Sequence, residues 1–352
     1  MLNTEDILKL NVLIKTSIAI RIDTYKLIVV GLNTQFKEQM INLSLTSDSD
    51  AYIKEVKELL INQVMGTMKG KYLSYLKHWS RIGQVTSSNL SLLLKLGEVE
   101  AVIAVSNAIK FDKNLLKLTW WCATNTANQA EIGRLLLTKD FVINTNIGRN
   151  IAKYLLELLP FIHDIEQLID TTNLILQKGL INKTEKAKLW EQGQKKTAFL
   201  VGFIERMNLK DIYFKIHTDI NIISFNFKHQ DLQLISNKQT QLLLKTTINI
   251  LKKINQETIL YRTLDVLGQY LYHPSITFKE SIVDITNQAN VMVCNIKDER
   301  EKLFARMLLA GVSERLVVST ISAHRLTGSA IRRKLINILS PIQKALDVLT
   351  TP

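Results

Sequence analysis

The chain has 352 residues, of which 46% are hydrophobic and 22% charged, with only 13 Gly and 4 Pro. This composition excludes collagen-like, low-complexity and wholly disordered chains, and the length suits two domains or one elongated helical array. The 45 Lys and Arg against 32 Asp and Glu leave a net charge of +13, which points to nucleic acid, an anionic membrane or an acidic protein as partner. The many Lys, Ile and Asn residues are also typical of AT-rich genes, which accounts for part of that charge.

The N-terminus and the apolar runs predict neither export nor a membrane span. Glu5 and Asp6 stand where a secretory signal carries basic residues, and no small-residue cleavage site follows an apolar stretch. The longest nearly uncharged apolar runs, 197–204 and 308–312, are far shorter than the roughly 20 residues needed to cross a bilayer. We therefore expect a cytoplasmic protein.

The predicted elements begin with a short helix and a small β element. Thr4, followed by two acidic residues, predicts an N-cap and a helix that ends at about Thr16. β-Branched runs within 19–31 and period-two alternation over 40–45 predict a small antiparallel β element. These segments form the first predicted division of the chain, residues 1–47.

Helical periodicity follows from Asp48 onward, and cap residues mark most helix starts. Asp112 and Asp164 each precede a helical run, and the residue spacing at 126–129 and at 182–185 predicts capping boxes. Helices of about 10 to 18 residues with short connectors are typical of antiparallel hairpins. Because no pattern recurs at a fixed spacing, the predicted fold class is mainly α: an irregular array of antiparallel helix hairpins with a small N-terminal antiparallel β element.

One segment interrupts the helical pattern. Residues 212–227 are rich in Ile, Tyr and Phe and have poor helical phase, which predicts a strand pair or an ordered loop. The predicted divisions after the first are therefore a helical array over 48–208, an irregular or β-like connection over 209–240, and a C-terminal helical part with a basic end over 241–352.

The motifs that could carry chemistry fail on spacing or on companions. Residues 66–71 resemble a phosphate-binding loop, but the glycines are one residue too close and Tyr72 replaces the required hydroxyl residue. None of the six histidines stands three or four residues from another, so no metal-binding face forms. Cys122 and Cys294 have no partner at disulfide or metal spacing, which indicates a reducing compartment. We expect no catalytic residue, no cofactor and no metal.

The clearest asymmetry of charge lies near the C-terminus. Residues 300–344 contain nine Lys and Arg against Glu301 and Glu314, and so supply +7 of the net charge. The predicted last helix has an apolar stripe on one face: Ile331, Leu335, Ile338, Leu339, Ile342, Leu346 and Leu349. Beside this stripe, in the first turns of that helix, stand Arg332, Arg333 and Lys334.

Two interpretations of this basic end stay open. In the first, a terminal helix packs its stripe on the body and its charges are solvated. In the second, a basic face binds RNA or an acidic partner protein. The candidate binding residues in the second are Arg325, Arg332, Arg333 and Lys334.

Several stretches spread along the chain form one pattern: LNVL at 10–13, AIRID at 19–23, WW at 120–121, YLLELLPF at 154–161, LWEQGQKKT at 189–197, AHRL at 323–326 and RRK at 332–334. Together they resemble the DsrS family, cytoplasmic accessory proteins encoded with the dissimilatory sulfite reductase genes of sulfur-oxidising bacteria. The resemblance implies a soluble accessory or regulatory protein of sulfur oxidation, without an assigned active site or cofactor. It supplies a pathway and not a mechanism.

The leading hypothesis is a non-enzymatic accessory or regulatory protein that binds another macromolecule of the sulfur-oxidation machinery through residues 300–344. One alternative is an RNA-binding post-transcriptional regulator, whose affinity would fall steeply with salt. The other is a sulfur carrier or enzyme that depends on Cys122 or Cys294.

Overall fold

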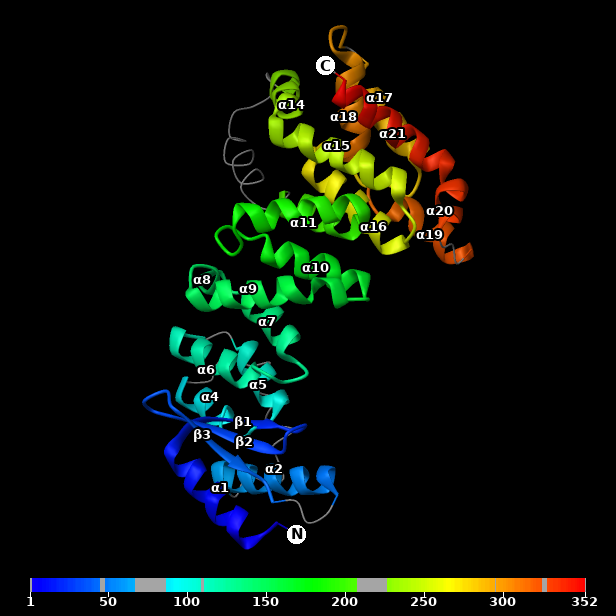
Figure 1. Cartoon of the computed structure of the whole chain (residues 1–352). Coiled ribbons are helices and arrows are strands. Elements are labelled where there is room, and N and C mark those ends of the chain that lie inside the picture. Colours follow the sequence, from blue (N-terminus) through cyan, green and yellow to red (C-terminus); the bar gives the residue numbers. More distant parts are fainter. Residues whose placement is uncertain are drawn as a thin grey trace. The chain divides into compact units, whose positions relative to one another are not determined.

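The computed structural model describes residues 2–44, 48–66, 87–108, 111–207, 227–294, 296–324 and 328–351. Over these residues the chain is mainly helical, with one small three-stranded antiparallel sheet near the N-terminus (Figure 1), which confirms the predicted fold class.

The chain forms two compact units. Unit 1 comprises Met1–Glu157 and Lys178–Leu180, and unit 2 comprises Leu158–Gln177 and Ile181–Pro352. Most of the predicted connection over 209–240 lies outside the described residues, so the divisions drawn from the sequence stay predictions.

Unit 1 contains the sheet and the N-terminal helices. Its elements are α1 (Thr4–Thr16), β1 (Ser17–Asp23), β2 (Ile28–Asn33), β3 (Glu38–Asn42), α2 (Ser49–Met65), α4 (Ser87–Leu93), α5 (Val99–Ser106), α6 (Lys113–Ala123), α7 (Gln129–Leu137), α8 (Asp140–Ile143) and α9 (Asn146–Leu158). Helices α1 and α2 lie on one face of the sheet, and α4 and α6 lie on the other (Figure 1).

The first helix ends at Thr16, as predicted, but its cap is one residue earlier than predicted. Asn3 has extended backbone dihedrals, and its side-chain oxygen accepts a hydrogen bond from the backbone N–H of Glu5 at 3.2 Å. Thr4 is already the first helical residue. Either side chain suits an N-cap, and the backbone conformation decides between them.

The sheet has the strand order β1-β2-β3, and both pairs of neighbouring strands are antiparallel. Val30 of β2 stands opposite Arg21 of β1 and Met40 of β3. The outer side of β1 is covered, since the backbone N–H of Ile20 donates to the carbonyl oxygen of Leu94 at 2.8 Å.

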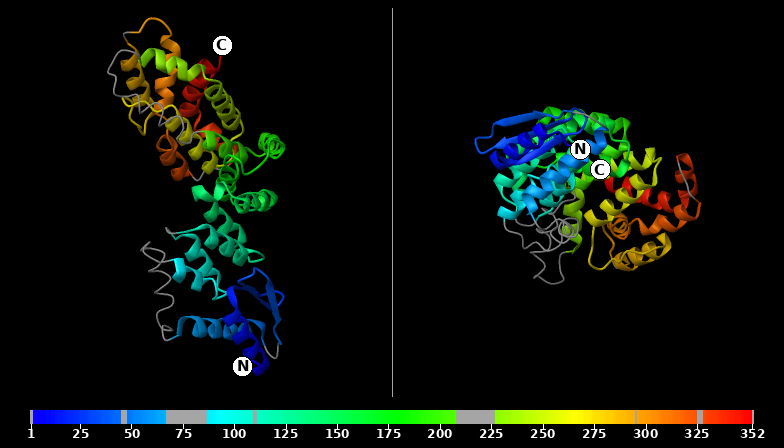
Figure 2. Two further views of the ribbon diagram at one scale, coloured as in Figure 1. Left: turned by 90° about the vertical axis from the view of Figure 1, so that its left-hand side faces the viewer. Right: turned by 90° about the horizontal axis from the view of Figure 1, so that it is seen from below.

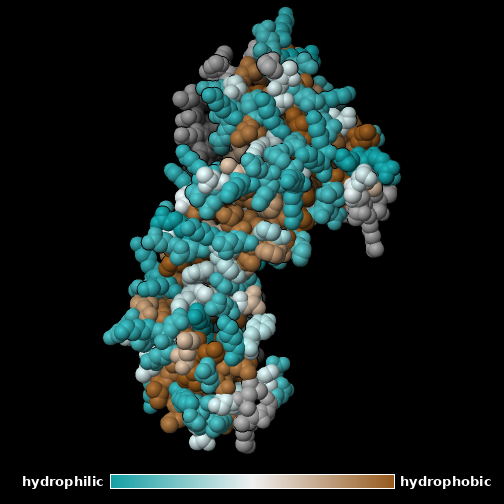
Figure 3. All heavy atoms as spheres, viewed as in Figure 1, coloured by the Kyte–Doolittle hydropathy of each residue, from teal (hydrophilic) through white to brown (hydrophobic). Residues whose placement is uncertain are grey.

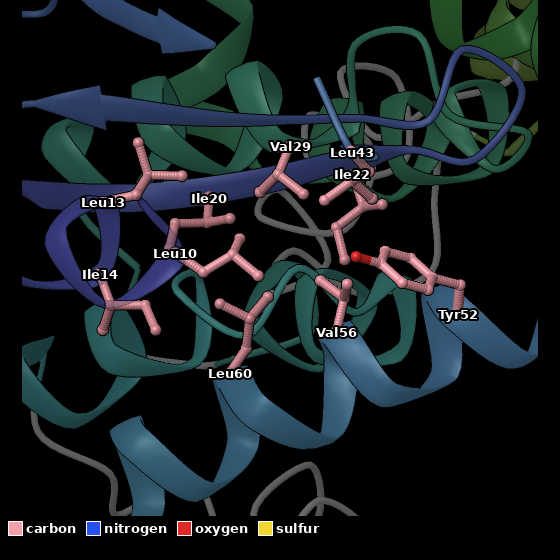
Figure 4. Packing of buried hydrophobic residues seen from close by; sticks show 10 residues of the cluster. All are labelled: Leu10, Leu13, Ile14, Ile20, Ile22, Val29, Leu43, Tyr52, Val56 and Leu60. Atoms are coloured by element: carbon pink, nitrogen blue, oxygen red, sulfur yellow. The ribbon is translucent and has the colours of Figure 1, made fainter. Parts of the chain in front are cut away.

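A hydrophobic core fills the space between the sheet and the first two helices. Its buried members are Leu10, Leu13, Ile14, Ile20, Ile22, Val29, Leu43, Tyr52, Val56 and Leu60 (Figure 4). Two polar groups lie within this unit's core: Tyr52 donates its hydroxyl hydrogen to Asp6 Oδ2 at 2.5 Å, and the Asp6 side chain is fully buried. Asp6 also accepts from the backbone N–H of Ser44 at 2.9 Å. The acid that the sequence assigns to the first turn of a helix therefore joins α1, α2 and the segment after β3.

The predicted caps are confirmed at three helices and wrong at one. Asp112 and Asp164 each accept from a backbone N–H three residues later, at 2.7 Å. Asn182 and Glu185 form both hydrogen bonds of a capping box, each of 2.8 Å. The predicted box at 126–129 does not form, because the Thr126 hydroxyl donates to the last turn of α6 and α7 starts at Gln129.

Unit 2 is helical throughout its described part. Its elements are the 3₁₀ turn η2 (Leu159–Phe161), α10 (Ile165–Ile175), α11 (Lys183–Lys195), α12 (Thr197–Met207), α14 (Phe227–Ser236), α15 (Lys238–Lys253), α16 (Glu257–Tyr270), α17 (Ile282–Val293), α18 (Arg300–Ala310), α19 (Arg315–His324), α20 (Ser329–Lys334) and α21 (Ile336–Thr350). Helices α15 and α21 pack side by side (Figure 1 and the left view of Figure 2).

Helix α12 is the central helix of this unit. All residues from Thr197 to Ile204 are buried, and α12 packs against α10, α11, α15 and α16. A helix that is apolar all round is typical of such a position. Gly202 permits the close approach to α10, since a Cβ atom there would lie 2.8 Å from the Thr172 side chain. In the described part of the chain, no helix combines the length and the apolar character that crossing a membrane requires.

A polar network ties α10, α12 and α16 together at the edge of this core. The Arg262 guanidinium makes a bidentate ion pair with Glu205, at 2.6 and 2.8 Å, and a further ion pair with Asp170 at 2.6 Å. Arg206 donates to the side-chain oxygen of Asn173 at 2.9 Å. Each of these charged side chains has a partner within the unit, so we assign the network a structural role.

Candidate binding surface

The structure places three of the four predicted binding residues on the short helix α20. Arg332, Arg333 and Lys334 are exposed and occupy its last turn. Arg325 lies outside the described residues. Arg306, which contributes to the basic excess of this region, is buried and pairs with Asp231 of α14 at 2.9 Å. Its charge is therefore not available at the surface.

The predicted single last helix is wrong, because the chain forms α20 and α21 with a break at Leu335. The predicted stripe is buried across both helices except for Ile338, which is partly buried. The basic residues thus stand at the C-terminal end of α20 and not in the first turns of a longer helix. This end of a helix favours cations, since the macrodipole is negative there.

Tertiary hydrogen bonds fix the direction of α20. Arg332 Nη1 donates to the backbone oxygen of Lys252 at 2.6 Å, and the backbone N–H of Gly328 donates to the backbone oxygen of Asn255 at 2.9 Å. The acceptors belong to the C-terminal end of α15 and the turn after it, where carbonyl groups lack helical partners. The periodicity of 331–349 contains no information on this contact, which is why the break was not predicted.

The same end of α15 also binds the end of α11. Lys253 Nζ donates to the backbone oxygen of Gln194 at 2.9 Å, and Asn249 Nδ2 donates to the side-chain oxygen of Gln194 at 2.8 Å. The C-terminal ends of three helices therefore meet. They bring seven basic residues together: Lys195, Lys196, Lys252, Lys253, Arg332, Arg333 and Lys334. We call these seven residues the basic surface.

The chain segments that form the basic surface contain little acid. The segments that form it, 194–196, 252–257 and 328–336, contain one acidic residue, Glu257. Among the described residues, Arg333, Lys334 and Lys252 make no ion pair and no side-chain hydrogen bond. Ile336, at the start of α21 and two residues after the basic cluster, is 60% exposed. Hydrophilic side chains gather where Figure 1 places α20, with apolar atoms beside them (Figure 3).

This arrangement suits the capture of a negatively charged group from outside. Basic side chains from three adjoining helix ends raise the local positive potential, which suits a negatively charged ligand. One backbone hydrogen bond, from Gly328 to Asn255, and side-chain hydrogen bonds from Arg332, Lys253 and Asn249 hold the three helix ends together. Lys195, Lys196, Lys252 and Lys253 were not predicted, and the only sequence signal for them is a Lys pair at the end of each helix.

The described tryptophans pack against other side chains. Trp120 lies edge-on to Tyr154 with ring centroids 5.9 Å apart, and Trp190 lies edge-on to Phe203 at 5.0 Å. Trp121 Nε1 donates to Glu38 at 2.7 Å. These three side chains are half-buried, and Trp79 lies outside the described residues.

The two cysteines have different environments. Cys122 is buried, and its Sγ lies 3.8 Å from the Ile20 carbonyl oxygen and 3.7 Å from that of Leu94. Burial raises the pKa of this thiol to about 12, against the weaker opposing effect of Arg21. The thiol is therefore protonated at neutral pH and is not a nucleophile. Cys294 is exposed at the end of α17.

The described histidines and their acidic neighbours have structural surroundings. No three His, Cys, Asp or Glu side chains in the described part of the chain could hold a metal ion. Asp164, the neighbour of His163, is engaged in capping α10. His273 is buried beside Arg306, and burial together with that charge lowers its pKa to about 4.

Comparison of the chain with models of protein families, with curated proteins and with solved structures finds no match. The assignment of function consequently depends on the basic surface and on the stretches that resemble the DsrS family.

Proposed function

We propose that this chain is a non-enzymatic accessory protein that binds an acidic segment of a partner protein through the basic surface. The observation that supports this most directly is the contact among three helix ends, whose segments 194–196, 252–257 and 328–336 carry seven basic residues and one acidic residue. The exposed cations that no described group neutralises, Arg333, Lys334 and Lys252, supply the attraction.

The apolar residue beside the cations favours a protein partner over RNA. Ile336 is 60% exposed two residues after Lys334, and an exposed aliphatic residue near basic ones suits an acidic peptide that carries its own apolar side chain. Single-stranded RNA is bound by stacking its bases on exposed aromatic rings. The described segments of the basic surface contain no aromatic residue. An RNA-binding regulator is the second candidate, and the net charge of +13 is the observation that favours it.

The resemblance to the DsrS family supplies the biological context of this proposal. It suggests a component of the dissimilatory sulfur-oxidation machinery as the partner and a cytoplasmic accessory role for the chain. Finding the gene beside those of sulfite reductase subunits would support this context. Finding it among unrelated genes would remove that support. A sulfur carrier that uses Cys122 has little support, since its thiol is buried and protonated.

The test of the proposed function uses charge reversal on the basic surface. The variant Arg333→Glu/Lys334→Glu changes two exposed residues that hold no described contact. The matched control is Lys238→Glu/Lys245→Glu, which makes the same change of charge at two exposed positions on α15. Arg332 is left intact, because it holds α20 on α15.

Binding is measured by fluorescence anisotropy with two labelled probes, an Asp/Glu-rich peptide that contains one Leu and a single-stranded RNA of equal charge. We expect the intact chain to bind the peptide, the α20 variant to lose about tenfold in affinity, and the α15 control to stay within about twofold. Equal losses of affinity in the two variants would contradict binding at the basic surface. Tighter binding of the RNA, with a steep dependence on salt, would replace the protein partner with RNA.

A further inference from the structure

The outer edge of β3 offers hydrogen-bonding groups that the sheet does not use. The backbone N–H of Asn33 donates to the Lys37 oxygen, and that of Leu43 donates to the Leu27 oxygen. These two bonds flank the β2–β3 ladder and, with its register, fix which residues of β3 bond to β2. Since bonded and non-bonded pairs alternate in an antiparallel ladder, Glu38, Met40 and Asn42 direct their N–H and C=O groups outward.

No described residue pairs with this edge. The strand order leaves β3 with one neighbour, whereas the outer side of β1 bonds to Leu94. Natural edge strands are protected by Lys, Pro or bulges. The strand Glu38–Asn42 contains neither Lys nor Pro, its register with β2 has no bulge, and Met40 is 68% exposed.

The edge is also held in place before any partner arrives. The Glu38 carboxylate accepts from Trp121 Nε1 at 2.7 Å and pairs with Arg21 at 3.1 Å. The Thr16 hydroxyl donates to the side-chain oxygen of Gln39 at 3.1 Å. A strand that is already extended and anchored loses little conformational entropy when another strand binds to it.

We propose that this edge pairs with the same edge of a second copy of the chain, antiparallel and about a two-fold axis at Met40. This register places Met40 opposite Met40 and Glu38 opposite Asn42, so that all three outward-facing residues of each strand form hydrogen-bonded pairs. The two three-stranded sheets then become one continuous six-stranded sheet. The contact is isologous, as closed dimers require.

The pattern of the strand fits a second copy of itself. No like charges oppose each other in this register, since Glu38 faces a neutral amide and the apolar Met40 faces itself. The net charge of the chain does not concentrate here, because Lys37 and Glu38 are the only charged residues from 36 to 44. A strand of five residues buries less than the roughly 1,200 Å² of a standard interface, so the dimer forms at high protein concentration.

The first test is sedimentation velocity over a wide range of concentration. Met40→Pro removes an outward N–H and leaves the bonds to β2 intact, since proline is tolerated on the free side of an edge strand. Met40→Lys opposes two charges across the axis without a change in the backbone. We expect a dimer in the intact chain and at least a tenfold weaker association in both variants. Tyr25→Ser, on the β1–β2 hairpin of the same sheet and 89% exposed, is the control that keeps the dimer.

The second test is a disulfide across the axis. Hydrogen-bonded antiparallel pairs have Cα atoms about 5.5 Å apart, which is within disulfide range. In a Cys294→Ser background, Met40→Cys is expected to give a covalent dimer under oxidation, and Tyr25→Cys is not. A chain that stays monomeric at every concentration overturns the proposal. So does a dimer that both Met40 variants leave unchanged, or one that Met40→Cys fails to cross-link.

Discussion

The burial of His273 predicts a specific dependence of stability on pH. The ring is 3% exposed, in the turn after α16, and its Nδ1 accepts from the backbone N–H of Ser275 at 3.2 Å. Burial, with the Arg306 charge as the second cause, lowers its pKa from 6.5 to about 4. Nearby, Arg306 forms an ion pair with Asp231, so the Asp231 carboxylate already has a positively charged partner.

The sign of the effect follows from comparing the two states. Between pH 6.5 and 4 the unfolded chain binds a proton at His273, and the folded chain does not. The stabilisation is therefore complete above pH 6.5 and is lost as the pH falls toward 4. At 1.36 kcal/mol per pKa unit, this shift lowers the free energy of unfolding, relative to its value at neutral pH, by about 2 kcal/mol at pH 5 and about 3 kcal/mol at pH 4. Screening by nearby solvent reduces the measured loss at pH 4 toward about 2 kcal/mol.

The variant His273→Asn isolates this contribution. An Asn side chain can accept the hydrogen bond from the Ser275 N–H, as in an Asx turn, but it does not titrate. Its smaller volume lowers the free energy of unfolding by an amount that does not depend on pH. Only the slope against pH therefore reports on the histidine.

The assay is urea unfolding between pH 7 and pH 4, followed by hydrogen exchange of peptides from α16 and α18 to confine the readout to unit 2. We expect the stability advantage of the intact chain over His273→Asn to shrink by about 2 kcal/mol across this range. Parallel stability curves for the two proteins would refute the reasoning. A histidine ring that titrates near pH 6.5 in the folded chain, observed by NMR, would refute it as well.

Two further predictions concern packing and a buried hydrogen bond. Gly268→Ala should lower the free energy of unfolding by about 2 kcal/mol, because its Cβ would overlap the backbone oxygen of Val312, which cannot rotate away. Gly133→Ala is the control, since its Cβ would meet only side-chain atoms, none closer than 3.1 Å, and thermal unfolding should show the two apart. Tyr52→Phe should cost about 2 kcal/mol in chemical unfolding, because the fully buried Asp6 carboxylate loses a hydrogen bond from the hydroxyl; an unchanged midpoint would contradict this role.

Local features of this protein could be read from its sequence because they depend on neighbouring residues. The caps at Asp112, Asp164 and Asn182 were predicted, since a side chain there needs only the N–H group two or three residues later. The small antiparallel sheet follows in the same way from alternation over short runs. The predicted capping box at 126–129 is wrong for a related reason. The Thr126 hydroxyl bonds to the end of the preceding helix instead of capping the next one.

The basic surface shows the limit of prediction from local sequence patterns. The sequence identifies Arg332, Arg333 and Lys334 as a cluster but assigns them to the first turns of one long helix. Contacts with residues 80 positions earlier, such as Arg332 with the Lys252 oxygen, separate α20 from α21 and set the cluster against the ends of two other helices. No local pattern records a contact at that distance along the chain.

Burial of charge is the other feature that only the tertiary structure decided. The sequence identifies Arg306, Asp6 and His273 only as polar residues. In the folded chain each of them is less than 5% exposed. Whether such a side chain is solvated depends on which helix covers it, and covering helices come from distant segments such as the α14 that brings Asp231 to Arg306. The sequence by itself thus determined the helical class and several helix starts, because hydrogen bonds within a few residues decide them. The tertiary structure determined which charges remain outside to bind a partner.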